Sequence, residues 1–89
     1  MGTTADAIDE FVISTLADFT YGRPEKMGRE TSLADLGVDS LALTTLATFV
    51  EAEYGCAFTP AQLTALHAAG QIGDVLQAVR QVVCRADEA

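Results

Sequence analysis

A serine stands between an aspartate and a leucine in the stretch LADLGVDSLALTTLATF, residues 33–49. A glycine at position 37 ends one short apolar pattern, and a longer helical pattern begins at about Ser40. Three kinds of chemistry are open to a serine placed in this way. Ser40 could cap a helix with its side-chain oxygen, attack a substrate as a nucleophile, or be a point of covalent attachment.

Helix capping at this position requires only one residue. Asp39 is as suitable as Ser40, because both side-chain oxygens can accept the backbone N–H groups of a first helical turn. If Asp39 is the cap, the Ser40 hydroxyl is left at the exposed start of the helix. Backbone N–H groups and the positive end of the helix dipole favour a phosphate there. The position is therefore chemically suited to a phosphodiester on Ser40.

A hydrolytic triad explains the same residues poorly. The only histidine, His67, falls in a separate predicted helix, and the chain lacks the strand–turn–helix elbow that usually presents a catalytic serine. We expect His67 to be a surface or half-buried structural residue. The paired carboxylates Asp9–Glu10 and Glu51–Glu53 are interpreted as solvated helix faces. We therefore expect no catalytic residue and no metal site.

The composition narrows the range of partners. Thirteen acidic residues against five basic ones give a formal net charge of −8, which repels nucleic acid and anionic bilayers and favours basic protein surfaces. Hydrophobic residues make up 49% of the sequence, enough for a folded core. Because the length suits one small domain, residues 1–89 should fold as a single domain. We expect a soluble, cytoplasmic monomer that binds neither nucleic acid nor membrane. Cys56 and Cys84 are expected to be reduced thiols.

Four helical patterns surround the serine, and no strand pattern of useful length appears. Apolar residues at three- and four-residue spacing predict helices over about 8–19, 40–54, 60–70 and 72–84. A long polar loop follows the first helix. Its basic residues Arg23, Lys26 and Arg29 could pair locally with acidic side chains and hold the loop, or contact an acidic partner, but we expect solvated charges. A single turn follows, which Thr31 or Ser32 could cap.

These elements predict an all-α fold, a four-helix antiparallel bundle with a long first loop and a short third helix. Gly37 is expected at a position that needs a positive φ angle. Gly73 weakens the start of the last helix. Phe19, Phe49 and Tyr54 are at core spacing, so we predict that they pack inside the bundle.

The run LGVDSL, residues 36–41, resembles the signature of acyl carrier proteins, which carry a 4′-phosphopantetheine arm on the serine of a Gly-x-Asp-Ser-Leu sequence. The long first loop, the TSLADLG approach and the short third helix also resemble that family, so the resemblance covers nearly the whole chain. It implies that a phosphopantetheinyl transferase joins the arm from coenzyme A to Ser40. It also implies that Asp39 is the cap and a transferase determinant, that Leu41 is a flanking apolar contact, and that Gly37 is the turn residue.

The same resemblance implies a carrier that catalyses nothing. Such a protein holds acyl or aminoacyl intermediates as thioesters on its arm and presents them to other enzymes. The expected partners are a loading ligase or acyltransferase and a ketosynthase or condensation enzyme.

The central helix departs from the pattern of many fatty-acid carriers, in which its exposed face is acidic. The matching positions here are neutral. Their threonines could be simply solvated, but we expect these positions to dock partners: Leu41, Ala42, Thr44, Thr45 and Thr48. This neutral face favours polyketide or another natural-product pathway. A peptidyl carrier of nonribosomal peptide synthesis and a fatty-acid carrier are alternatives. From other classes, a helical docking domain would need no chemistry at Ser40, and a small hydrolase would turn over substrate unaided.

Overall fold

The structure is a computed structural model in which residues 5–20 and 26–88 are described, with the backbone alone for residue 5 and residues 84–88. It contains five helices in the order α1 (Ala5–Phe19), α2 (Leu33–Leu36), α3 (Ser40–Tyr54), α4 (Pro60–His67) and α5 (Ile72–Glu88). Within the described ranges, the one extended pairing is an isolated bridge between Ser32 and Gln71. The predicted all-α fold is therefore confirmed, including the short helix α4 and the single turn α2.

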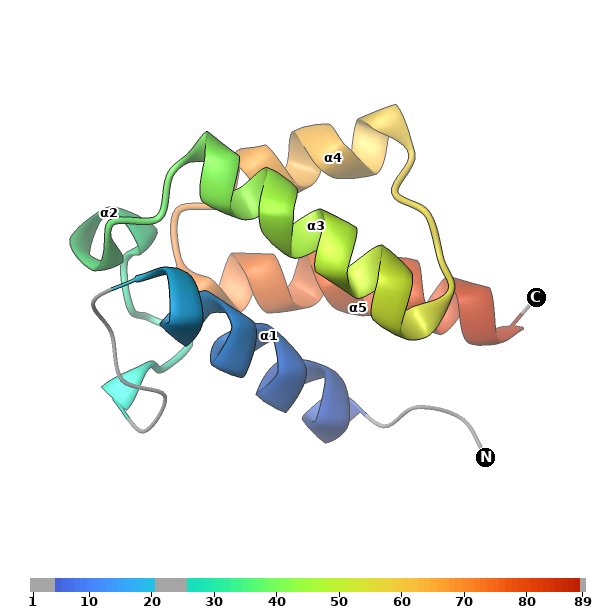
Figure 1. Cartoon of the computed structure of the whole chain (residues 1–89), viewed down its shortest axis with the longest axis horizontal. Helices are drawn as coiled ribbons and strands as arrows, with labels where there is room; N and C mark the ends of the chain where they lie inside the picture. Colours follow the sequence, from blue (N-terminus) through green and yellow to red (C-terminus); the bar gives the residue numbers. More distant parts are fainter. Residues whose placement is uncertain (1–4, 21–25, 89) are drawn as a thin grey trace.

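The four longer helices form the bundle, and successive ones run in opposite directions (Figure 1). α1 and α4 each pack against both α3 and α5, which run in the same direction as each other. The buried side chains of the described residues are all apolar. The side chains without exposed surface include Ile8, Val12, Leu16, Leu46, Val50, Leu66, Val75 and Val79. Because α3 contributes to the centre of this core, its N-terminal end is held in a fixed place.

The ends of the helices follow local signals with two differences. α3 ends at Gly55, whose φ of 64° is left-handed and whose N–H donates to the Glu51 carbonyl at 3.0 Å. α4 begins with a capping box in which Thr59 and Gln62 satisfy each other's backbone N–H groups. However, α4 ends at His67 and not at residue 70, and α5 continues to Glu88, beyond the predicted end at residue 84. No glycine or proline follows position 84, so nothing in the sequence stops α5 there.

The first loop is fastened to the start of α5 by backbone hydrogen bonds. Ile72 donates to the Thr31 carbonyl at 3.0 Å, and Gly73 donates to the Arg29 carbonyl at 2.8 Å. A Cβ atom at position 73 would lie 3.1 Å from that Arg29 oxygen. A side chain at this position would push the Arg29 backbone back by a few tenths of an ångström, so glycine favours the close approach, although it lowers the helix propensity of the first turn of α5.

The expected capping of the single turn α2 by Thr31 or Ser32 is wrong. Ser32 occupies the N-cap position, but its side chain makes no capping hydrogen bond. The Thr31 hydroxyl oxygen instead accepts the N–H of Gly28 at 3.0 Å, within the loop. The Leu33 N–H is taken up by the Gly70 carbonyl at 3.1 Å. The turn is thus positioned by the neighbouring segment 70–73 and not by its own cap.

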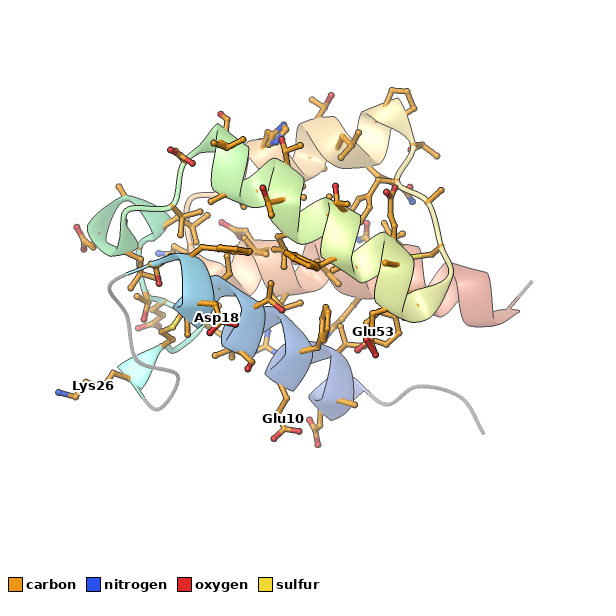
Figure 2. All side chains as sticks on the ribbon, viewed as in Figure 1. Glu10, Asp18, Lys26 and Glu53 are labelled. Atoms are coloured by element: carbon orange, nitrogen blue, oxygen red, sulfur yellow. The ribbon has the colours of Figure 1, made fainter. Side chains whose placement is uncertain are left out.

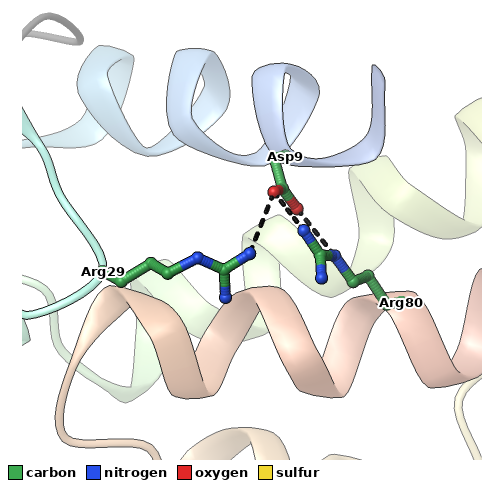
Figure 3. Close-up of polar contacts among 3 residues, drawn as sticks. All are labelled: Asp9, Arg29 and Arg80. Atoms are coloured by element: carbon green, nitrogen blue, oxygen red, sulfur yellow. Dashed lines mark hydrogen bonds and ion pairs between the residues drawn. The ribbon is translucent and has the colours of Figure 1, made fainter. Parts of the chain in front are cut away.

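Two arginines converge on Asp9 in α1 (Figure 3). Arg80 of α5 donates from Nε to Asp9 Oδ1 at 3.0 Å and also contacts Asp9 Oδ2 through its Nη2 group. Arg29 of the first loop lies 3.4 Å from the same Oδ2. For Arg29 the alternative of local pairing with an acidic side chain is therefore the one observed, although the side chain stays mostly exposed. Lys26 is exposed as expected (Figure 2), and Arg23 lies outside the described residues.

Replacing Asp9 with alanine is expected to lower the free energy of unfolding by about 1–3 kcal/mol, mainly through the loss of charge-assisted hydrogen bonds to Arg80. The Arg29 pair adds little, since that side chain is 57% exposed. Glu10 is the matched control, because it is the next residue of α1, exposed and equally charged. Glu10→Ala should change stability by less than about 0.5 kcal/mol in urea denaturation. Equal losses in the two variants would contradict a specific role for Asp9.

Candidate functional site

A tight turn between α2 and α3 sets the position of Ser40. Gly37 adopts φ 78° and ψ 21°, and its N–H donates to the Ala34 carbonyl at 3.1 Å. Val38 then donates to the Leu33 carbonyl at 3.0 Å and packs against the core. A residue with a side chain would be destabilised at the left-handed conformation of position 37 by about 1–2 kcal/mol. The expectation of a positive φ at Gly37 is confirmed.

Asp39 caps α3, as the sequence predicted. Its backbone is extended, with φ −118° and ψ −175°, and its Oδ1 accepts the N–H of Ala42 at 2.9 Å. Ser40 is the first residue of α3 and is exposed. Because Asp39 provides the cap, the Ser40 hydroxyl is not needed for capping. It lies at the surface, beside the backbone N–H groups of the first helical turn.

Two substitutions at Asp39 separate the effect of the capping hydrogen bond on stability from the effect of the carboxylate charge. Asp39→Ala is expected to lower the free energy of unfolding by about 1 kcal/mol, because the Ala42 N–H loses its partner. Asp39→Asn should stay close to wild type, since the asparagine side-chain oxygen can accept the same bond. Thermal or urea denaturation measures both. An equal loss in the two variants would show that the carboxylate charge, not the hydrogen bond, stabilises this end of α3.

A hollow of about 270 Å³ adjoins the serine. It brings together the turn before α3, the first residues of α3 and the connection between α4 and α5. Its lining residues are Leu33, Ala34, Val38, Asp39, Ser40, Leu43, His67, Ala69 and Gly70. The surface of the hollow is thus about evenly polar and apolar, with the Ser40 hydroxyl, the Asp39 carboxylate and the His67 ring as its polar side chains.

His67 is an exposed residue, consistent with the prediction of a surface histidine, and its Nε2 lies 3.2 Å from the Thr44 hydroxyl oxygen. That hydroxyl donates its one hydrogen to the Ser40 carbonyl at 2.9 Å. The Thr44 oxygen must therefore accept from His67, which assigns the proton to Nε2. In this arrangement His67 Nε2 is a donor that links α4 to the first turn of α3, not a base directed at Ser40.

The outward face of α3 is neutral in the way its sequence indicates. Leu41 is 73% exposed. Thr45 and Thr48 donate their hydroxyl hydrogens to the carbonyls of Leu41 and Thr44, at 2.9 and 3.1 Å. Because these hydrogens are used within the helix, the groups that the two threonines leave for other contacts are methyl groups and oxygen lone pairs. Ala42 is half-buried beside them.

Asp39 stands directly before α3, but the acidic residues within the helix lie in its second half. Its first turn contains no acidic residue, and Glu51 accepts the backbone N–H of Phe58 at 2.8 Å, which fixes the segment after α3. The exposed Glu53 lies near the other end of the helix (Figure 2). There, partial burial and then the negative charge of Glu53 raise the pKa of Tyr54, whose ring packs edge-on against Phe11 at 5.5 Å.

The prediction that Phe19 and Phe49 pack in the core is wrong. Their side chains are 40% and 48% exposed, and the two rings stack at the surface with centroids 5.8 Å apart. Phe49 lies eight residues after the exposed Leu41 and four after the half-buried Thr45, so it continues their row on the outer side of α3, beside the buried Val50. That spacing was the available signal for its exposure. Tyr54 is half-buried and packs against the core as expected.

Other chemistry is limited among the described residues. No group of three or more histidine, cysteine or acidic side chains could hold a metal ion there. No described helix is both long and apolar enough to cross a membrane. Cys56 is half-buried, with its Sγ 3.9 Å from the Val50 carbonyl oxygen, and the side chain of Cys84 lies outside the described residues.

Comparison with known families assigns the chain. The family model described as a phosphopantetheine attachment site matches residues 10–79, which include all of α2, α3 and α4. No curated protein and no solved structure matches the chain. The residues present fit such a group, since an exposed hydroxyl stands at a helix N-terminus, where a phosphodiester is favoured, beside a hollow of about 270 Å³. The chain therefore belongs to the phosphopantetheine attachment site family, and its prosthetic group is a covalently attached 4′-phosphopantetheine.

Proposed function

We propose that Ser40 is the attachment residue and that residues 1–89 form a single acyl carrier domain. The supporting observation is the exposed hydroxyl of Ser40 at the start of α3, inside the family match. In the attachment reaction Ser40 Oγ bonds to the phosphorus next to pantetheine in coenzyme A. The pyrophosphate bond breaks, adenosine bisphosphate leaves, and the serine proton passes to a base of the transferase. Asp39 keeps the first turn intact while the hydroxyl reacts.

The protein then acts as a covalent shuttle with no catalysis of its own. The arm supplies a terminal thiol that holds an acyl or aminoacyl group as a thioester. The chain's residues hold the attachment point on a rigid helix, so each enzyme that docks receives the cargo at a high effective concentration. The Thr44–His67 hydrogen bond contributes to this rigidity by joining α4 to the first turns of α3.

The neutral face of α3 is proposed as the docking surface for partner enzymes. It consists of Leu41, Ala42, Thr44, Thr45 and Thr48. Without acidic residues in its first turn, this surface depends on shape and apolar contact more than on charge steering. We therefore favour a cytoplasmic, monomeric carrier of polyketide or related natural-product synthesis over a fatty-acid carrier. Its partners would be a phosphopantetheinyl transferase, a loading ligase or acyltransferase, and a ketosynthase or condensation enzyme.

The test is intact-protein mass after incubation with coenzyme A, magnesium and a broad-specificity phosphopantetheinyl transferase. A gain of one phosphopantetheine on Ser40 is expected. No lysine or arginine lies between Arg29 and Arg80, so trypsin leaves Ser40 in one long peptide with Ser32 and several threonines. Fragmentation of that peptide is therefore needed to locate the arm. If the folded protein gains no mass, even with the native host's transferase, the result would favour a helical docking domain.

The modified protein separates the pathways. Loading by a malonyl acyltransferase or acyl ligase supports the acyl carrier, whereas loading by an aminoacyl-adenylating enzyme supports the peptidyl carrier. Efficient turnover with fatty-acid elongation enzymes, together with failure in natural-product extension, would overturn the specialised role.

A further inference from the structure

Two aromatic side chains form an exposed patch where α1 meets α3. Phe19 is the last residue of α1 and Phe49 lies in the second half of α3. Their rings stack with an interplanar angle of 22°. Among the described residues, the exposed large hydrophobic side chains are these two and Leu41. Stacked aromatics at a surface carry a large apolar area in a fixed geometry, which is typical of binding sites. We call this pair the aromatic patch.

The aromatic patch lies on the flank of α3 that faces α1. Leu41, Thr45 and Phe49 follow one another at four-residue spacing, so they form one row that ends at the patch. By helical rise, Phe49 is about 12 Å along the axis from Leu41. The opposite flank of α3 faces α4 and the segment before it. There His67 Nε2 donates to the Thr44 hydroxyl oxygen, and the Phe58 N–H donates to the Glu51 carboxylate. The patch is therefore on a different side of the helix from the hollow beside Ser40.

Each of the two helices that form the aromatic patch carries an acidic residue near it. Asp18 precedes Phe19, and Glu53 follows Phe49 by one helical turn; both are exposed. Figure 2 shows the two carboxylates on α1 and α3 on the same face of the molecule. Neither α1 nor α3 contains a lysine or an arginine. An apolar centre with an acidic rim is complementary to an apolar recess edged by basic side chains.

We propose that the aromatic patch is a docking surface for a protein partner that presents an apolar recess flanked by lysine or arginine side chains. This surface is additional to the neutral face next to Ser40 and does not depend on attachment of the arm. A second copy of the chain is a poor occupant, because each copy carries a formal charge of −8 and like charges would meet at the rim. An anionic bilayer is repelled for the same reason.

The test uses an amphipathic helical peptide of leucine and lysine as a probe, titrated into the isotope-labelled full chain. Amide shifts are expected to centre on the end of α1 and on residues 45–53. Affinity should fall with added salt, and a peptide with glutamate in place of lysine should not bind. The double variant Phe19→Ser with Phe49→Ser should weaken binding at least tenfold. Both rings are substantially exposed, so the variant should fold, and circular dichroism checks this.

A charge-matched pair of variants separates the patch from general attraction to an acidic protein. Asp18→Lys and Glu10→Lys change the net charge equally on the same helix, yet Asp18 adjoins the patch and Glu10 lies two turns away (Figure 2). Asp18→Lys should lower the affinity for the peptide at least threefold more than Glu10→Lys does. Equal weakening, or amide shifts centred elsewhere, would overturn the proposal.

Two further measurements decide between occupants. Sedimentation velocity should show a monomer, and sedimentation with anionic phosphatidylglycerol vesicles should show no binding. A dimer, or vesicle binding, that the serine double variant abolishes would overturn the proposal. The double variant should still gain the arm at Ser40, so a failure at the patch and a failure of the proposed carrier function are distinguishable.

Discussion

A chain in which Ser40 is replaced by alanine is expected to fold as the wild type does and to gain no phosphopantetheine. The reason is that Asp39, not Ser40, caps α3, whereas Ser40 contributes an exposed hydroxyl. Alanine has a better helix propensity than serine, so the helix loses nothing. Urea denaturation measures the stability of the folded variant, and intact mass after treatment with coenzyme A and transferase measures the absence of the arm.

Two hydroxyl residues of the same long tryptic peptide provide the controls. Ser32 stands before α2 and Thr44 one turn along α3 from Ser40. Ser32→Ala and Thr44→Ala should both gain one phosphopantetheine, because neither supplies the attacking oxygen. Thr44→Ala also removes the hydrogen bond to His67, so it tests whether that link is needed for attachment. A full mass gain in Ser40→Ala would contradict the assignment of the site.

Most of the site could be predicted because it depends on local signals. Asp39, Gly37 and the helix that begins at Ser40 lie within a few residues of one another, and each acts through its own backbone conformation or its nearest N–H groups. The structure reproduces the cap, the positive φ angle and the bounds of α3. A short sequence is sufficient for features whose causes are this close together.

Features that join distant segments could not be predicted in the same way. Asp9 and Arg80 are 71 residues apart, and nothing near either one indicates the pair. From the sequence alone, Gly73 only lowers the helix propensity of α5. Its role becomes visible in the structure, where the Arg29 carbonyl lies against it. Phe49 has the spacing of both the core row and the exposed row, and only the packing of α1 against α3 decides between them. Packing partners, not local propensity, determine these outcomes.

Replacing leucine with alanine is expected to affect stability very differently at two positions of α3. Leu46 has no exposed surface, whereas Leu41 is 73% exposed. Leu46→Ala should lower the free energy of unfolding by about 2–5 kcal/mol, because it leaves a cavity among the helices. That is a large part of the roughly 4–13 kcal/mol that a domain of this size has in total. Leu41→Ala should change stability by less than about 0.5 kcal/mol in urea denaturation.

The rate of arm attachment should reverse this order. If Leu41 contacts the transferase, as its exposure beside Ser40 suggests, Leu41→Ala should slow attachment several-fold in a fully folded protein. Leu46→Ala should slow it only in proportion to the unfolded fraction, because its side chain touches no partner. Initial rates measured by mass, at a temperature where both variants are folded, separate the two effects. An unchanged rate in Leu41→Ala would remove Leu41 from the docking surface, and slowing by Leu46→Ala when fully folded would mean that core packing shapes the site.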